Sequence, residues 1–373
     1  MTRRMLTRPA LPGPKGPGLR ALAVVAIAAA AGALTYAQQA GAQLNVMPIR
    51  GNVFMIVGGG SNVTVSAGVD GILLVDTGSA AMADKMLEKV TEVGHMMAGS
   101  PAPMTTCVGP NCHPAGSLGS FLPFGWAGPS YNAVIASPKP LKPIRWIIQT
   151  TVDTDHNGGT AKIAAAGTTY NGGEAGRLTG ERSPATVIGH ENLLKRMTLG
   201  KYPEASWPTE TYYIPTYKMS QYFNGEGIQM YHAPGANTDA DTFVHFRFSD
   251  VIAAGDLFTP GRYPNIDVAK GGTVNGLIGG LNMVIAIAFP ESRHQGGTMI
   301  VGGHGRLGDT ADVAIYRNMV EIVRDRLQDM KKDGKTLAQI KAAKPTLDFD
   351  GIYGAPDKFI DAVFQTLGDK QDK

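Results

Sequence analysis

The stretch that decides the fold reads Ile144-Arg145-Trp146-Ile147-Ile148-Gln149-Thr150-Thr151-Val152-Asp153-Thr154-Asp155-His156-Asn157-Gly158-Gly159. Its apolar first part predicts a β-strand, and its second part supplies an acidic residue, a histidine and a glycine pair. A carboxylate and an imidazole are ligands for a metal ion, and the glycines allow the next helix to begin close by. In an extended chain Thr151, Asp153 and Asp155 point to one side. The stretch therefore predicts a metal site at the end of a strand.

The rest of the chain alternates predicted strands with predicted helices. Alternating or β-branched runs bounded by Gly and Asp predict strands at 52–57, 62–66, 71–76, 210–217, 227–232, 241–248, 251–254 and 297–301. Helical spacing, or small and apolar composition, predicts helices at 80–93, 160–166, 189–197, 272–288, 312–332, 336–343 and 357–367. Residues 97–143 are rich in Gly, Pro and Ser without periodicity and predict an irregular insertion. This order indicates an α/β protein with helices outside a β core.

Five motifs in this order resemble the metallo-β-lactamase-fold hydrolase superfamily. They are Val75-Asp76-Thr77-Gly78, Thr151-Val152-Asp153-Thr154-Asp155-His156, the segment His232 to Asp241, Ala254-Gly255-Asp256-Leu257-Phe258, and Gly303-His304-Gly305. The second of them is a degenerate form of His-x-His-x-Asp-His, in which both leading histidines are replaced. Order and spacing are together more specific than any one motif, and they match from about residue 50 to about residue 310.

The resemblance implies a four-layer αββα sandwich, with the metals in a cleft at one edge of the two sheets. It implies a metallo-β-lactamase-like domain over residues 43–311, which contains the insertion at 97–143. Residues 312–373 are expected to form C-terminal helices that pack on the same domain.

The resemblance also implies a metal centre with one intact half and one altered half. The ligands of the second metal correspond to Asp155, His156 and His304, and Asp256 is the residue shared between the two metals. The three histidines of the first metal correspond in this chain to Thr151, Asp153 and Asn237. A hydroxyl and a neutral amide are poor zinc ligands, so one zinc ion is expected at the second site.

Such a site supplies three protein ligands and one open position, which is the arrangement of a catalytic metal. We expect Asp155 to bind the metal, Asp256 to complete the coordination or to orient a water molecule, and Asp153 to act as a base. The additional carboxylate would also accommodate iron or manganese. A lone Asp-His pair or His304 could equally be a structural loop residue, and the joint pattern is what favours a metal.

The N-terminal residues 1–42 read as an export signal. Basic residues are followed by the apolar run 21–36 and then by Ala40-Gly41-Ala42, a small-x-small cleavage site. The run is shorter than a membrane-spanning helix needs, and Thr2-Arg3-Arg4-Met5-Leu6 resembles a twin-arginine signal. A periplasmic or secreted protein without stable membrane insertion is expected.

The formal charge of +3 depends on that segment. Five of the 34 basic residues lie before position 43, so 29 remain against 31 acidic residues, a charge of −2. A negative overall charge does not support binding of nucleic acid. The expected substrate is a small molecule.

Cys107 and Cys112 are the only two cysteines. In an oxidising compartment they are expected to form a short disulfide. The alternative is a spacing variant of a c-type haem attachment motif with His113, but no second axial ligand can be identified.

Two classes of function therefore remain. The leading hypothesis is an exported metal-dependent hydrolase with an unidentified substrate. The alternative is a degenerate member of the superfamily, a binding or accessory protein that keeps the fold without catalysis. A haem-carrying redox partner is a weaker third candidate. Hydrolysis of β-lactams has no support in the sequence, because one fold hosts many chemistries.

Overall fold

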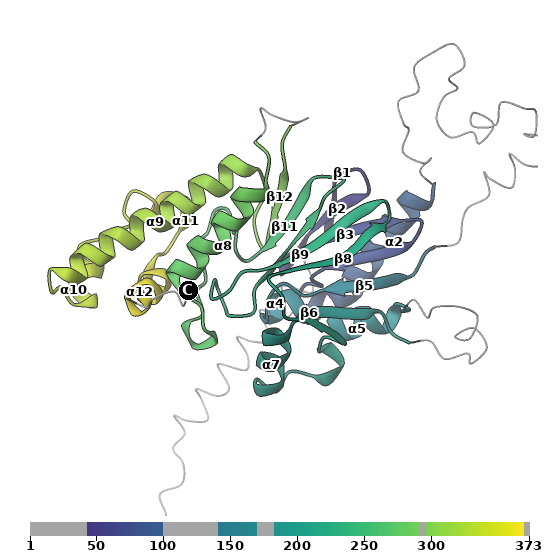
Figure 1. The fold of residues 1–373 in the computed structure, drawn as a ribbon, viewed down its shortest axis with the longest axis horizontal. Coiled ribbons are helices and arrows are strands. Elements are labelled where there is room, and N and C mark those ends of the chain that lie inside the picture. The colour runs from purple at the N-terminus through teal and green to yellow at the C-terminus, as the bar shows by residue number, and fades with distance from the viewer. Residues whose placement is uncertain (1–42, 100–140, 170–182, 291–295, 369–373) are drawn as a thin grey trace, which may run out of the picture. The chain divides into compact units, whose positions relative to one another are not determined.

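Two stacked β-sheets form the centre of the fold (Figure 1). The computed structural model describes residues 43–99, 141–169, 183–290 and 296–368. These residues fall within one compact unit that begins at Gln43. The expected export signal, most of the expected insertion, and Cys107, Cys112 and His113 lie outside the described residues.

Within the described residues, one sheet has seven strands. In spatial order they are β1 (Asn45–Arg50), β2 (Val53–Gly59), β3 (Ser61–Gly68), β4 (Gly71–Val75), β5 (Ile144–Ile148), β6 (Thr186–His190) and β7 (Glu210–Tyr212). Strands β1 to β4 pair antiparallel, and β4 to β7 pair parallel. Because parallel neighbours end at the same edge of a sheet, the residues that follow β4 and β5 come together there.

The other sheet has six described strands. Their spatial order is β13 (Leu307–Gly308), β12 (Met299–Gly302), β11 (Val251–Gly255), β10 (Thr242–Phe246), β9 (Glu226–His232) and β8 (Thr216–Phe223). The pairing of β11 with β12 is parallel, and the other pairs are antiparallel. The parallel pair again brings two strand ends, at Asp256 and at His304, to one edge.

Helices cover the sheets. The α-helices are α2 (Ala83–Gly99), α4 (Thr154–Asn157), α5 (Thr160–Ala166), α7 (Glu191–Leu199), α8 (Val274–Ile287), α9 (Thr310–Lys332), α10 (Leu337–Ala342), α11 (Asp350–Tyr353) and α12 (Asp357–Thr366). Short 3₁₀ turns occur at η1 (Ala80–Met82), η3 (Glu204–Ser206) and η4 (Val268–Lys270). Helix α2 extends to Gly99, slightly into the region expected to be irregular.

Strand alternation separates two hydrophobic cores. On β11, Val251 and Ala253 belong to the core between the two sheets, whereas Ile252 and Ala254 belong to the core beneath the helices. Successive side chains of a strand point to opposite faces, so one short strand serves both cores. The sheet residues of the first core come from β2, β4, β5, β6 and β7 on one side and from β9 to β12 on the other.

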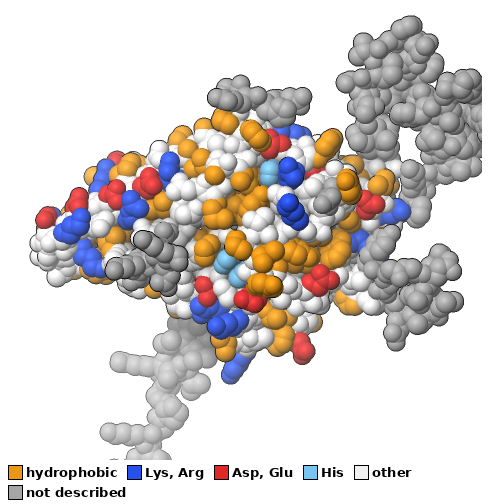
Figure 2. Space-filling view, viewed as in Figure 1, with side chains coloured by type: hydrophobic (Ala, Val, Ile, Leu, Met, Phe, Trp, Pro, Cys, Tyr) orange, Lys and Arg blue, Asp and Glu red, His pale blue; other side chains and the backbone are white. Residues whose placement is uncertain are grey.

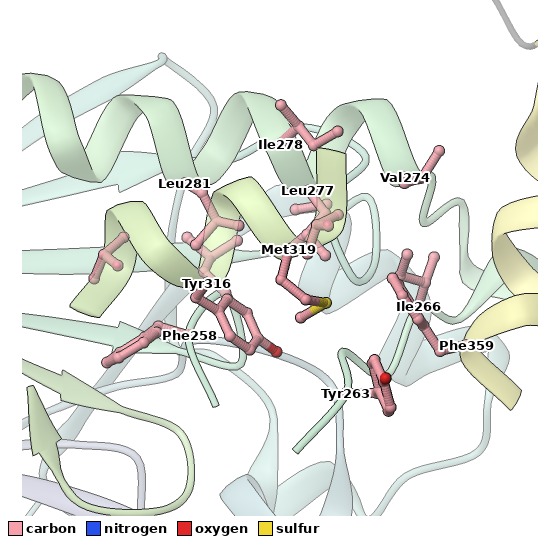
Figure 3. Packing of buried hydrophobic residues seen from close by; sticks show 14 of the residues in the cluster. Phe258, Tyr263, Ile266, Val274, Leu277, Ile278, Leu281, Tyr316, Met319 and Phe359 are labelled. Carbon is pink, nitrogen blue, oxygen red and sulfur yellow. The ribbon is translucent and has the colours of Figure 1, made fainter. Parts of the chain in front are cut away.

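Helices α8, α9 and α12 close the outer face of the second sheet. Figure 3 shows their side chains meeting around Tyr316, Met319 and Leu281. The ring of Phe359 from α12 stacks on Tyr263 with 5.2 Å between the centroids. Helices α2 and α5 pack on the first sheet, and Figure 1 shows them on the side of the sheets away from α8 and α9. The result is the expected αββα sandwich with helices at the C-terminal end.

The predictions for two elements were wrong in detail. The predicted strand 210–217 is divided into β7 and β8, which belong to different sheets. Pro215 lies between them and has no N–H to continue a ladder. The predicted helix 189–197 begins only at Glu191, because Gly189 and His190 are the end of the buried strand β6.

Among the described residues, no helix is both long and apolar enough to cross a membrane. Figure 2 shows acidic and basic side chains intermingled over the end of the visible face formed by α9 and α10.

Candidate metal centre

Asp76, directly after β4, connects three parts of the site. It is buried and has a φ of 64°, a left-handed conformation that Asp tolerates better than most residues. Its Oδ1 accepts a hydrogen bond from the backbone N–H of Thr150 at 2.9 Å, and its Oδ2 accepts one from the Thr150 hydroxyl at 2.6 Å. Oδ2 also lies 2.7 Å from His156 Nδ1. The carboxylate therefore fixes both the exit of β5 and the orientation of His156.

The segment after β5 differs from the expected extended chain. Residues Thr154–Asn157 form the one-turn helix α4, so Thr151, Asp153 and Asp155 do not continue a strand alternation. The turn is closed by the hydrogen bond from Gly158 N to Thr154 O at 2.9 Å. A side chain at Gly158 would collide with the backbone of Ala80 and Thr154, so glycine permits this close packing. The turn places Asp155 and His156 on successive helical positions.

His156 lies between two carboxylates and is fully buried. Its Nδ1 faces Asp76, and its Nε2 lies 3.1 Å from Asp256 Oδ1. Burial by itself would lower the pKa of His156, but Asp256 and Asp76 together raise it well above its ordinary value. With Nδ1 protonated toward Asp76, loss of the Nε2 proton would free the Nε2 lone pair for a metal ion.

Asp256 follows β11 and His304 follows β12. Burial would raise the pKa of Asp256, but His156 holds it below its ordinary value. His304 Nε2 lies 3.2 Å from Asp155 Oδ2 and 3.6 Å from Asp256 Oδ1. The rings of His156 and His304 meet edge to face at 5.5 Å. The pKa of Asp155 is lowered to about 2, because its hydrogen bond to His304 and the charges of His156 and His304 outweigh its burial.

Asn62, at the start of β3, holds the loop that carries His304. Its Nδ2 donates to the carbonyl oxygens of Gly302 and Gly305, both at 3.0 Å, and its N–H donates to Gly303 O at 2.8 Å. Sequence reasoning missed the contributions of Asn62 and Asp76 to this site. The motif around Asp76 was recognised, but the partner of its side chain lies 80 positions away.

The ligand atoms of Asp155, His156 and His304 lie within 4.8 Å of one another. Within the described residues this is the one such group of at least three His, Cys, Asp or Glu side chains, and Asp153 is not in it. Asp256 is not in it either, although its Oδ1 contacts both histidines. Two imidazole nitrogens and a carboxylate oxygen are the donor types that zinc accepts, so these residues fit one metal ion.

The side chains of Thr151, Asp153 and Asn237, at the positions expected for a first metal, do not form a metal site. Thr151 and Asn237 are almost fully buried, and Thr151 Oγ1 and both polar side-chain atoms of Asn237 have no hydrogen-bond partner among the described residues. Asp153 Oδ1 accepts a hydrogen bond from Lys270 Nζ at 3.0 Å. Burial would lower the pKa of Lys270, but Asp153 and Asp267 raise it above its ordinary value.

His190, at the end of β6, and His232, at the end of β9, form a stacked pair. Their ring centroids are 3.7 Å apart with 2° between the planes. His190 Nδ1 accepts from Asn192 N at 3.3 Å and caps α7, and His232 Nδ1 lies 3.1 Å from the carbonyl oxygen of Asp241. Burial and the neighbouring His190 lower the pKa of His232 to about 4.

No family model matches the sequence, and no curated protein sequence matches it. Among solved structures, the chain is similar to the stereoselective inverting sec-alkylsulfatase Pisa1 from Pseudomonas sp., with 15% identity and a TM-score of 0.57, covering 86% of this chain and 50% of that one. A double mutant of that enzyme gives 15% identity and a TM-score of 0.55, with 90% and 52% covered. The DIM-1 metallo-β-lactamase gives 11% identity and a TM-score of 0.46, with 75% and 97% covered.

The chain spans about half the length of the alkylsulfatase structures that it matches. At this level of identity the likeness concerns the fold. The sequence motifs predicted two stacked sheets with helices on both outer faces, and these are present. They also predicted a group of Asp and His side chains, which lies where β5 and β12 end. The chain therefore shares its αββα fold with the sec-alkylsulfatase structure.

Proposed function

We propose that this chain is an exported, metal-dependent hydrolase that binds one metal ion, most simply zinc, through Asp155, His156, Asp256 and His304. The observation that carries the proposal is the convergence of Asp155, His156 and His304 at the ends of strands from both sheets. Iron or manganese would also suit a site with two carboxylates. When bound, the metal would polarise the scissile group of a substrate and lower the pKa of a water molecule.

The side chains of this chain would have distinct tasks. Asp76 holds the Nδ1 proton of His156, so that Nε2 is presented to the site. Asp155, which contacts His304, would bind the metal, and Asp256, which contacts both histidines, would complete the coordination or orient a water molecule. Asp153 is the proposed base, and its Oδ1 is held by Lys270. The substrate would be a small molecule.

Elemental analysis of the purified protein tests this proposal. We expect about one metal per chain and not two, because only one set of residues fits. His304→Ala should abolish binding, since it removes one of the converging ligands. Asn237→Ala should change metal content little. Two tightly bound ions in the wild type, or retention of metal by His304→Ala, would contradict the assignment.

A second candidate function is a binding or accessory protein. The unpartnered side chains of Thr151 and Asn237 favour it, because neutral hydrogen-bonding groups stand where the resemblance implies metal ligands. The zinc-loaded protein should be assayed on a panel of esters, lactones, phosphodiesters and a secondary alkyl sulfate, the last because the similar structure is described as a sec-alkylsulfatase. Turnover that is lost in Asp256→Asn supports the hydrolase. Inertness across the panel together with tight binding of one panel member supports the binding protein.

The proposal includes export through the signal at residues 1–42 and a disulfide between Cys107 and Cys112 in the oxidising compartment. Both are inferred from the sequence, and both concern residues outside those described.

A further inference from the structure

Lys270 is held between two carboxylates, one of which belongs to Asp153, the residue directly before the helix α4 that carries Asp155 and His156. Its Nζ lies 3.0 Å from Asp153 Oδ1 and 3.0 Å from Asp267 Oδ2. Its backbone is fixed as well, because its N–H donates to Asp267 Oδ1 at 3.1 Å and its carbonyl oxygen accepts from Asp239 N at 2.9 Å. The ammonium therefore sits on a short, doubly tethered segment at the end of η4.

The segments around Lys270 carry the three positions that do not fit a first metal. The N–H of Asp267 donates to Asn237 O at 2.8 Å, which joins the η4 segment to the β9–β10 loop. The N–H of Thr242 donates to Thr150 O at 2.8 Å, which joins that loop to the exit of β5. Lys270 completes the connection through Asp153. Asp153 and Asp267 therefore hold the Lys270 ammonium between them, whereas the Arg196 guanidinium pairs with Asp239 of the β9–β10 loop.

An ammonium and a metal ion compete for the same carboxylates. At contact distance two like charges repel strongly unless water screens them, and the Lys270 side chain is only 30% exposed. A second metal ion would need Asp153, because hydroxyl and amide oxygens bind zinc poorly. Lysine is well suited to occupy such a place, since its charge is compact and its long stem can reach across a loop.

We propose that the ammonium of Lys270, held by Asp153 and Asp267, takes the place of a first metal ion in this centre. It thereby restricts the chain to one metal ion. This inference extends the proposed function, on which its account of the single metal rests. The removal of the ammonium leaves the carboxylates of Asp153 and Asp267 without the cation that lies between them. Such a set of hard oxygen ligands suits Mn²⁺ better than zinc.

The test compares Lys270→Met with a matched control, Lys341→Met. Lys341 also bridges two aspartates, Asp357 at 3.3 Å and Asp361 at 2.6 Å, and its side chain is also 30% exposed. That ion pair lies between α10 and α12, among the C-terminal helices. Zinc-loaded proteins are titrated with Mn²⁺, and free Mn²⁺ is followed by electron paramagnetic resonance.

We expect Lys270→Met to bind one Mn²⁺ per chain at least about tenfold more tightly than wild type, because a fixed positive charge has been removed. Wild type, Lys341→Met and the charge-preserving Lys270→Arg should not gain this binding. Lys270→Gln gives the same comparison if the Met variant does not fold. Equal Mn²⁺ binding by wild type and Lys270→Met, or an equal gain in Lys341→Met or Lys270→Arg, would overturn the inference.

Zinc content is measured in the same samples, which separates the two proposals. Wild type without zinc contradicts the proposed function and leaves the comparison of Mn²⁺ binding intact. One zinc per chain with no Mn²⁺ gain in Lys270→Met contradicts the role of Lys270 alone.

Discussion

At the scale of single residues, the site depends on side chains that hold the candidate ligands in place. Asp76 accepts hydrogen bonds from Thr150 and orients His156. A carboxylate behind a ligating histidine fixes the tautomer and raises the basicity of the ligand. Thr151 and Asn237 show the opposite case, because Thr151 Oγ1 and both polar side-chain atoms of Asn237 are buried without a hydrogen-bond partner among the described residues.

Asp76→Asn should weaken zinc binding by about 10- to 100-fold, because the amide keeps the shape of Asp76 and loses the charge that orients His156. The measurement is competition for zinc against a chelator of known affinity. Asp70→Asn is the control: Asp70 precedes the same strand, and its Oδ2 accepts from Asn224 N at 2.7 Å away from the site. Equal zinc affinity in Asp76→Asn and wild type would show that the contact is only structural.

The His190–His232 pair predicts a pH dependence of stability. The pKa of His232 is lowered to about 4 in the folded chain, against an ordinary value of 6.5. The unfolded chain therefore binds more protons between these values, and this contribution to stability is lost as pH falls from about 6.5 to about 4. His232→Gln should show a smaller decrease in unfolding free energy between pH 7 and pH 5 than wild type, measured by urea denaturation. An identical or larger decrease would contradict this role.

At the scale of elements, the site is assembled from strand ends. Parallel pairing of β4 with β5 aligns Asp76 with the exit toward His156, and parallel pairing of β11 with β12 aligns Asp256 with His304. Asn62 on β3 joins the two sheets at this edge. Precise placement of ligands on strand ends suits a site that must hold its geometry.

Asn62→Ala should loosen the loop that carries His304. It leaves the carbonyl oxygens of Gly302 and Gly305 without their donor, which costs about 1–3 kcal/mol of stability, and it should also lower zinc affinity. Thermal unfolding and zinc competition measure the two effects. Asn52→Ala is the control, because Asn52 Nδ2 donates to Asn224 O at 3.0 Å in a different region. We expect both variants to lose stability and only Asn62→Ala to lose zinc affinity. Unchanged zinc affinity in Asn62→Ala would contradict the role of Asn62 in holding the His304 loop.

At the scale of the whole molecule, the C-terminal helices share a core with the second sheet. Val313, Tyr316 and Met319 of α9 and Phe359 of α12 belong to the same cluster as Phe243 of β10. A shared core predicts that residues 43–311 and 312–373 unfold together.

Phe359→Ala should therefore lower the unfolding free energy of the entire fold by about 3–5 kcal/mol, because the buried ring stacks on Tyr263. Tryptophan fluorescence, which includes Trp146 on β5, and far-ultraviolet circular dichroism should report one common transition. Phe248→Ala, at a residue that is 80% exposed, should change little. Separate transitions for the two probes would mean that the C-terminal helices form an independent unit.

Several elements of this fold were predictable from local pattern. Helices expected at 272–288 and 312–332 occur at Val274–Ile287 and Thr310–Lys332, because long periodic segments with good caps carry a strong signal. Strand β1 was missed, since it contains Pro48 and none of its residues is buried. The helical turn α4 was also missed, because four residues are too few to show a period.

The sequence by itself predicted the fold class and the candidate ligands Asp155, His156, Asp256 and His304, since each of these residues stands in a recognisable motif after an apolar strand. Only the tertiary structure decided which groups face one another. The contacts of His156 with Asp76 and Asp256 span 80 and 100 positions, and that of Lys270 with Asp153 spans 117. Contacts of that range leave no periodic signature in the chain, because they depend on how strands pair and how the sheets stack.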